Sequence, residues 1–241
     1  MNKVKVLGID FDNYSLSEFK NEFISRLNNH LSTMIVTANP EIVMAANQDH
    51  EFMEIIQRDA DYVTADGIGI VLAGKMQNTP IAERVTGYDL FTWFLHVANL
   101  RGMKVYLIGA KPEVITATEA RIAQDYPNIK VVGAQDGYFK DDLNTVAQKI
   151  ELTKPDMVFA AIGFPRQEKL IAIMRRDNLP AMMMGVGGSF DVFSGKVKRA
   201  PELFQKSHLE WFYRLITNPT RLKRMMVLPK FVIEVKKNKK R

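Results

Sequence analysis

The chain contains no cysteine among its 241 residues, and nowhere do about 18 consecutive apolar residues occur. The first absence excludes a disulfide framework and thiolate metal sites, and it fits a reducing, cytoplasmic setting. The second predicts no transmembrane helix, so that any membrane contact is expected to be peripheral. The apolar stretch near the start is too short for a secretory signal, and Asp10 and Asp12 interrupt it.

Metal-binding patterns are also scarce. The four histidines are scattered without the spacing of metal ligands. Asp10-Phe11-Asp12 has the form of a DxD pair that holds a divalent cation, but no further acids cluster close to it after the first predicted strand. The sequence therefore predicts no metal and no cofactor.

Positive charge is concentrated at one end. Residues 206–241 hold 11 Lys/Arg against 2 Asp/Glu, which leaves 22 against 25 in residues 1–205 of a chain whose net charge is +6. Such a block usually indicates an anionic partner, either an acidic membrane surface or nucleic acid. The remainder, in a chain that is 46% hydrophobic, is long enough to bury a full core.

Apolar, β-branched runs alternate with helical periodicity over most of the chain. Strands are predicted at residues 4–9, 34–37, 62–64, 105–109, 130–133, 157–162 and 181–186. Clear helices are predicted at 16–27, 88–99, 113–124, 143–152 and 167–176. This alternation predicts an α/β fold with a Rossmann-like, mostly parallel sheet flanked by helices.

A boundary is predicted near residues 195–201. It divides the chain into an α/β domain, residues 1–195, and a C-terminal helical basic appendage, residues 196–241. Two helices are expected in the appendage, at about 202–216 and 220–236, because Asn218-Pro219 disfavours helix between them. Its aromatic and basic composition is that of a helix pair at a membrane interface, although the aromatic side chains could instead pack on the core.

Four apolar runs each end at a polar turn that leads into helical sequence: VTANPE, VTADGIG, AIGFPRQE and MGVGGSFD. In a parallel sheet these turns share one edge, where ligands bind beside exposed side chains and helix N-termini. The side chains found there suit an oxygen-rich, phosphate-bearing ligand: Thr37, Asn39, Asp66, Gln167 and Asp191. The pattern therefore predicts an enzyme.

Each of these residues also has a structural interpretation. Asn39 before Pro40 is a good helix N-cap, and Asp66-Gly67 is a common turn dipeptide. Asp66 and Arg84 together would offer a general base and a cation for a departing phosphate, but Arg84 could simply pair with a nearby acid. Asp191 could bind a ribose hydroxyl or cap a helix.

Eight segments in order resemble the WecG/TagA/CpsF family, glycosyltransferase family 26: TANPEIV, ADGIGIV, ERVTGYDL, GAKPEV, GYF, IGFPRQE, GVGGSFDVFSGKVKRAP and LEWFYRLITNPTRLKR. The opening LGIDFDNYSL is most like the TagA/TarA branch, whose members work in wall teichoic acid synthesis. The resemblance implies an inverting, metal-independent transfer of N-acetylmannosamine from its UDP donor to the 4-hydroxyl of undecaprenyl-diphosphate-linked N-acetylglucosamine. It also implies a position on the inner face of the plasma membrane.

The resemblance assigns roles to particular residues. Asp66 would be the general base, and Thr37, Arg84 and Gln167 would complete the catalytic group. Substrate binding would involve Asn39, Gly109, Ala110, Gly137, Tyr138, Gly163, Gly187, Asp191, Arg214, Arg221 and Arg224. The arginines among them would help to stabilise the leaving diphosphate in the absence of a metal.

Three rival functions remain open at this point. A relative within the same family could use another UDP-sugar, for capsule or enterobacterial antigen. A nucleic-acid-binding module could use the basic tail, but its affinity would fall steeply with salt and would not need Asp66. A regulator could bind the nucleotide without turnover. No nucleic acid partner is predicted, and a homo-oligomer remains one option.

Overall fold

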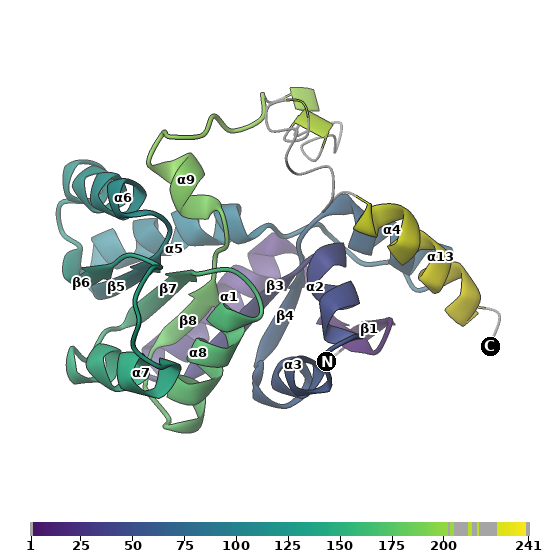
Figure 1. The fold of residues 1–241 in the computed structure, drawn as a ribbon, viewed down its shortest axis with the longest axis horizontal. Coiled ribbons are helices and arrows are strands. Elements are labelled where there is room, and N and C mark those ends of the chain that lie inside the picture. Colours follow the sequence, from purple (N-terminus) through teal and green to yellow (C-terminus); the bar gives the residue numbers. More distant parts are fainter. Residues whose placement is uncertain (1, 202, 205–211, 214–215, 217–225, 240–241) are drawn as a thin grey trace.

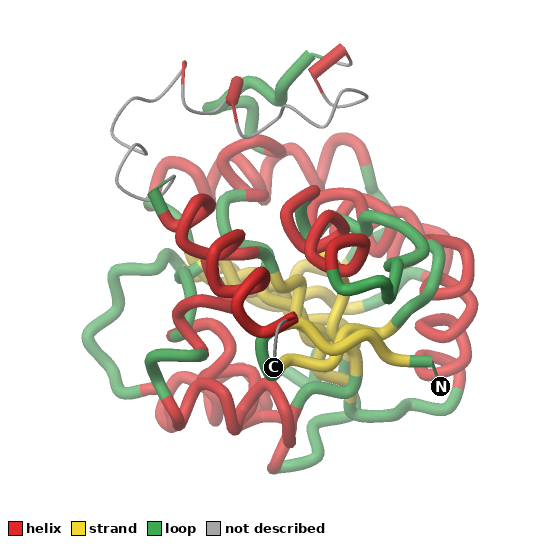
Figure 2. Tube along the Cα trace, turned by 90° about the vertical axis from the view of Figure 1, so that its right-hand side faces the viewer, coloured by secondary structure: helices red, strands yellow, loops and turns green. Residues whose placement is uncertain are grey.

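The structure of this chain is a computed structural model, which describes residues 2–201, 203–204, 212–213, 216 and 226–239. Its centre is a sheet of six parallel strands in the order β4-β3-β8-β7-β5-β6 (Figure 1). Figure 2 shows the strands at the centre with helices around them. The strands are β3 (Thr33–Ala38), β4 (Tyr62–Ala65), β5 (Lys104–Gly109), β6 (Lys130–Gln135), β7 (Met157–Ala161) and β8 (Met182–Gly185). The predicted parallel α/β fold is confirmed.

Helices cover both faces of the sheet. On one face lie α1 (Leu16–Asn28), α5 (Gly87–Arg101), α6 (Pro112–Asp125) and α9 (Ser189–Phe193). On the other lie α2 (Pro40–Ala46), α3 (His50–Glu54), a π-helical turn η1 (Ile55–Asp59), α4 (Ile68–Met76), α7 (Leu143–Leu152), α8 (Arg166–Arg176) and α13 (Val227–Lys239). Every residue of β3, β4, β7 and β8 is buried, which explains their nearly continuous apolar runs.

The first predicted strand, residues 4–9, is wrong as a single strand of the main sheet. The chain forms a separate antiparallel hairpin there, from β1 (Lys3–Val6) and β2 (Ile9–Asp12). Leu7 and Gly8 make its two-residue turn with φ of 46° and 87°, both positive as a tight hairpin turn of type I′ requires. The pattern of apolar residues did not reveal this reversal.

The hairpin also changes the interpretation of Asp10 and Asp12, which lie within β2 rather than after a strand. The Asp12 carboxylate is 2% exposed. It accepts a hydrogen bond from the Val63 backbone N–H at 2.8 Å and lies 3.4 Å from the Lys3 ammonium. Asp12 therefore ties the hairpin to β4.

The final helix, α13, packs against α2 and α4 and is buried there at Phe231 and Val235 (Figure 1). It begins at Val227 and continues beyond the predicted end at residue 236. Most of the predicted helix at 202–216, and residues 220–225, fall outside the described residues, so the division at residue 195 stays a prediction. No helix in the described part of the chain is both long enough and apolar enough to cross a membrane.

Candidate active site

The carboxyl ends of the six parallel strands lie at one edge of the sheet, and the predicted polar residues follow them. Thr37 is the second-last residue of β3, and Asn39 comes directly after that strand. Asp66 is the first residue after β4. Gln167 lies in the first turn of α8, after β7. Three segments that are far apart in sequence are thereby brought to the same edge.

Asp66 is held by two neighbouring segments. Its backbone N–H donates to the Ala38 carbonyl at 2.9 Å, which fixes the turn after β4 beside the end of β3. Its carboxylate oxygen Oδ2 accepts a hydrogen bond from the backbone N–H of Gly87 at 3.2 Å. Gly87 is the first residue of α5, whose N-cap is Thr86. The carboxylate thus lies at a helix N-terminus, where the backbone dipole favours negative charge.

Thr37 connects this carboxylate to the middle of the sheet. A Cβ on Gly87 would lie 2.9 Å from the Thr37 Oγ1, so α5 reaches this close only because its first residue is glycine. The Thr37 hydroxyl donates to the Gly185 carbonyl, at the end of β8, at 3.3 Å. Thr37 is 8% exposed. The Thr37 hydroxyl therefore lies between the Asp66 side of the site and the end of β8.

Gln167 completes the contiguous group. Its amide packs against Gly185, where an added Cβ would lie 2.4 Å from Nε2 of Gln167. The space beside the Gly185 backbone is therefore occupied by Gln167 itself. Thus Gln167, Gly185, Thr37, Gly87 and Asp66 form one continuous line of contacts across the ends of β8, β3 and β4.

Glu168 is a residue that the sequence prediction missed. Its side chain is 2% exposed, and its Oε1 accepts a hydrogen bond from Nε2 of Gln167 at 2.8 Å. Burial raises the pKa of Glu168 to about 7, against the lowering effect of that hydrogen bond. Glutamate is rarely fully buried in proteins, so neither its residue type nor its place in the first turn of a helix signalled this burial.

Asn39 has the capping role that its sequence context indicated. Its Oδ1 accepts a hydrogen bond from the Ile42 N–H at 3.0 Å, with Pro40 at the start of α2. A substrate-binding role for Asn39 stays a prediction. So does that of Asp191, which is half-buried in the short helix α9.

Two of the predicted glycines face open space. Gly163 and Gly187 have φ of 79° and 49°, which few side-chain-bearing residues adopt. A Cβ at either position would meet nothing within 4 Å. These two loops therefore leave room beside the backbone after β7 and β8.

The remaining predicted binding residues form a second group beyond β5 and β6. The backbone N–H of Ala110 donates to the Ala161 carbonyl at 3.0 Å, and that of Gly137 donates to the Ala110 carbonyl at 2.9 Å. Arg166 donates to the Gly137 carbonyl at 3.1 Å. Gly109 must be glycine, because a Cβ would lie 2.3 Å from the Ala161 backbone. Tyr138 is 69% exposed at the tip of this group.

The predicted cations divide between the described and undescribed parts. Arg84 is half-buried in the segment before α5, next to Val85, whose N–H donates to the Ala65 carbonyl at 3.1 Å. This backbone bond places Arg84 beside the end of β4. Arg214, Arg221 and Arg224 lie outside the described residues.

The described residues contain no evident group of metal ligands. Among them, no three His, Asp or Glu side chains lie together so that they could hold a metal ion. The carboxylate of Asp10 lies 3.5 Å from the Lys5 ammonium, on the hairpin. The absence of a metal from the reaction stays a prediction.

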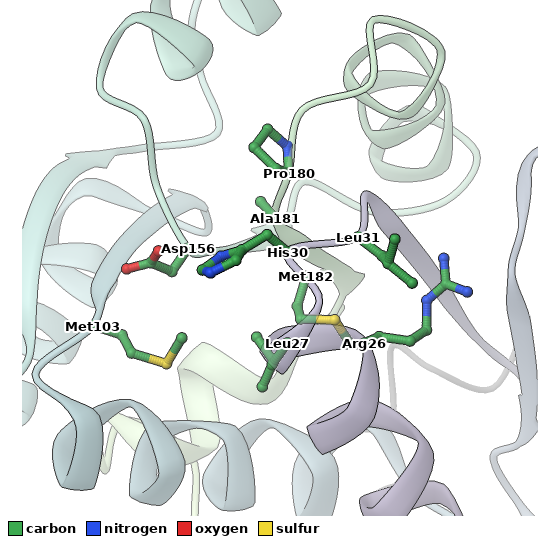
Figure 3. Close-up of a pocket in the computed structure, with 9 residues that line it drawn as sticks. All are labelled: Arg26, Leu27, His30, Leu31, Met103, Asp156, Pro180, Ala181 and Met182. Carbon is green, nitrogen blue, oxygen red and sulfur yellow. The ribbon is translucent and has the colours of Figure 1, made fainter.

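A pocket lies at the opposite edge of the sheet, and Figure 3 shows the side chains that line it. Met103 and Asp156 come just before β5 and β7, and Ala181 comes just before β8. These are the amino ends of the strands. The pocket is therefore separate from the predicted site at the carboxyl ends.

Comparison with known proteins identifies the family. The sequence model of the glycosyl transferase WecG/TagA/CpsF family matches residues 4–241. This chain belongs to that family. The predicted resemblance is confirmed, and as a member of the WecG/TagA/CpsF family the chain is a glycosyltransferase.

Similar proteins share one name, N-acetylglucosaminyldiphosphoundecaprenol N-acetyl-beta-D-mannosaminyltransferase. The one from Bacillus spizizenii is 43% identical over 233 residues, 96% of this chain and 90% of that protein. That of Bacillus subtilis is 43% identical, covering 90% of this chain and 86% of its own. That of Staphylococcus aureus is 39% identical over 99% of this chain and 94% of its own. The similarity to these proteins thus extends over nearly the whole chain.

Proposed function

We propose that this glycosyltransferase moves N-acetylmannosamine from UDP-N-acetylmannosamine to the 4-hydroxyl of undecaprenyl-diphosphate-linked N-acetylglucosamine, with inversion at the sugar. The observation that carries the proposal is full-length similarity, at 39–43% identity, to transferases whose name states the acceptor lipid and the sugar. The product would be the lipid-linked disaccharide from which teichoic acid synthesis starts. The site at the strand ends supports the proposal, because it places the Asp66 carboxylate in one line of contacts with the Thr37 hydroxyl and the Gln167 amide.

In this mechanism Asp66 is the general base. Its carboxylate takes the proton from the acceptor 4-hydroxyl as that oxygen attacks C1 of the donor sugar. The bond between C1 and the diphosphate oxygen breaks, and its electron pair leaves with UDP. The hydrogen bond from the Gly87 N–H fixes one carboxylate oxygen, which orients the base for this transfer.

Neighbouring polar residues position the reactants. Thr37 and Gln167 belong to the same line of contacts as Asp66 and are assigned to the catalytic group. Asn39, Gly163, Gly187 and Asp191 are assigned to substrate binding, together with the second group at Gly109, Ala110, Gly137 and Tyr138. The open space beside Gly163 and Gly187 supports this assignment, because a ligand can approach their backbone closely.

Cations are assigned to the leaving diphosphate. Arg84 is assigned this role because it lies beside the end of β4. Arg214, Arg221 and Arg224 are assigned the same role from the sequence alone. Charge-assisted bonds from guanidinium groups suit phosphate oxygens, and such stabilisation can replace a metal ion.

The C-terminal segment is assigned to the anionic inner face of the plasma membrane, where the lipid acceptor is held. Helix α13 supports this assignment, because its docked side carries Phe231 and Val235 while Val232 and Ile233 are 37% and 52% exposed. Its last turn contains Lys236, Lys237 and Lys239. Each basic residue near an anionic surface contributes about 1 kcal/mol of attraction.

Transfer to a lipid-diphosphate-N-acetylglucosamine analogue tests the proposal. The purified protein is incubated with UDP-N-acetylmannosamine in EDTA, and the disaccharide lipid is analysed by NMR for its linkage and anomeric configuration. A β-1,4-linked product supports the proposal. Faster transfer from a UDP-uronic acid or UDP-glucose would show that the donor is another UDP-sugar. No product with any of these donors would refute the proposed acceptor.

Asp10→Asn is the matched control for Asp66→Asn, because it removes a carboxylate on the hairpin with the same chemical change. The proposal expects Asp10→Asn to retain wild-type turnover and Asp66→Asn to lose it. Turnover that requires added Mg²⁺ or Mn²⁺, and that Asp10→Asn abolishes, would refute the metal-independent mechanism.

A further inference from the structure

Glu168 lies in an apolar part of the interface between α8 and the sheet. Helix α8 packs against β3, β7 and β8, whose sequences TMIVTA, MVFAA and MMMG contain no ionisable side chain. It also packs against α7 and η1. An ionised carboxylate in such a position would have neither water nor a counter-ion beside it, so burial disfavours the charged form.

The ionisable groups on α7, η1 and α8 do not balance a charge on Glu168. Ion pairs join Lys169 to Glu51, Arg175 to Asp61 and Arg176 to Asp59, while Arg58 also contacts Asp59. On α7, Lys149 pairs with Asp141, and Glu151 has its pKa raised by burial. Arg166 bonds to the Gly137 carbonyl. Burial and hydrogen bonding, rather than these charges, determine the pKa of Glu168.

The hydrogen bonds of the Gln167 and Glu168 side chains are incomplete if Glu168 is ionised. Nε2 of Gln167 donates to Oε1 of Glu168 at 2.8 Å. The other two oxygens, Oε1 of Gln167 and Oε2 of Glu168, are buried and have no hydrogen-bond partner among the described residues. Both are acceptors, so no bond can form between them unless one carries a proton.

We propose that Glu168 is a positioning residue of the active site: as a neutral acid it pairs with the Gln167 amide and holds that amide against Gly185. A proton on Oε2 of Glu168 provides the missing donor, directed to Oε1 of Gln167. The planar acid and the planar amide then share two hydrogen bonds, and both unpartnered oxygens are satisfied.

The consequence for the site follows from the line of contacts. Gln167 packs on Gly185, and the Gly185 carbonyl accepts the hydrogen bond from Thr37 beside Asp66. Ionisation of Glu168 would remove the O–H donor to Oε1 of Gln167 and leave only the bond from Nε2, so the amide would be held by one hydrogen bond in place of two. Turnover should therefore fall when the carboxyl loses its proton. This part rests on the proposed transferase function, because it needs Gln167 to act in catalysis.

Two substitutions at Glu168 distinguish the neutral acid from an ionised carboxylate. Glu168→Gln has the same shape and keeps one donor and one acceptor at every pH, so it reproduces the neutral pair. Glu168→Leu removes both bonds but leaves an apolar side chain of similar volume, which buried sites tolerate. Thermal unfolding confirms that each variant is folded. Glu151→Gln on α7 is the control for loss of a half-buried glutamate elsewhere.

Turnover is measured against pH for the 241-residue chain and for each variant. The expected wild-type kcat falls as pH rises through about 7. Glu168→Gln should lack this fall, Glu151→Gln should retain it, and Glu168→Leu should lose about 10- to 100-fold in kcat at all pH values because Gln167 is no longer held. An unchanged kcat in folded Glu168→Leu, or the same alkaline fall in Glu168→Gln, overturns the proposal.

A second measurement does not depend on the reaction. The side-chain amide signals of Gln167, followed by NMR with ¹⁵N-labelled glutamine, should shift with a midpoint near 7 in the wild type and stay constant in Glu168→Gln. No shift in the wild type overturns the pairing. If the amide titrates as expected but no sugar is transferred, the pairing stands and the transferase function fails.

Discussion

The raised pKa of Glu168 predicts a specific dependence of stability on pH. Folding moves the pKa of this carboxyl from 4.5 to about 7, so between these values the folded state holds a proton that the unfolded state has released. Stability contributed by that proton is lost as pH rises, and above the folded pKa the burial of a charge costs about 3 kcal/mol. Below the unfolded pKa the penalty is absent.

Glu168→Gln removes this titration. From about pH 5.5 to about pH 8.5, the free energy of unfolding of the variant should gain about 2 kcal/mol relative to the wild type, since part of the penalty is already present at the lower pH. Urea unfolding at several pH values, followed by circular dichroism, measures the difference. Glu113→Gln, an exposed glutamate on α6, is the control.

The reasoning is refuted if the difference between Glu168→Gln and the wild type is the same at every pH in this range. A constant difference would mean that the carboxyl has the same proton affinity in the folded and unfolded states. It would place water or a counter-ion next to Glu168 in solution.

Three further substitutions test other contacts. Gly185→Ala places a Cβ 2.4 Å from Nε2 of Gln167, so the amide must move and kcat should fall about 10- to 100-fold without unfolding, as measured by steady-state kinetics. Phe231→Ala removes a side chain of α13 that is 1% exposed where this helix packs on α2 and α4, and urea unfolding should show a loss of about 3–5 kcal/mol. Asp12→Asn removes the charge that ties β2 to the Val63 N–H, so it should lower the melting temperature without creating a metal requirement. A wild-type kcat in Gly185→Ala or an unchanged stability in Phe231→Ala would contradict these expectations. So would metal-dependent activity in Asp12→Asn.

Much of the central sheet was predictable because its strands are buried on both faces. The runs at β3, β4, β5, β7 and β8 are apolar, and helical periodicity separates most of them. The hairpin at β1 and β2 was not predictable in the same way. Its apolar content is that of one strand, and its reversal depends on Leu7 adopting a positive φ that the residue type does not favour.

The positions of the candidate site residues were predictable where a polar residue follows the end of a strand. Thr37, Asn39, Asp66 and Gln167 are polar residues at such positions, and parallel strands bring their ends together. Glu168 was missed because residue type does not reveal which face of a helix a charged side chain occupies.

The role of Gly87 depends on a different kind of information. It is recognisable only once α5 is seen to approach Thr37 and the Gly87 N–H is seen to bond to Asp66. Such contacts join segments that are distant in sequence, so they come from packing and not from a local motif.

The turnover rate of Asp66→Asn tests the central claim most directly. With saturating UDP-N-acetylmannosamine and the lipid-diphosphate-N-acetylglucosamine analogue, the account predicts that kcat falls about 100- to 10,000-fold, because the amide cannot accept the acceptor proton. Binding of UDP, measured by calorimetry, should remain close to that of the wild type. A variant whose kcat stays within about threefold of the wild type would contradict the assignment of Asp66 as the general base.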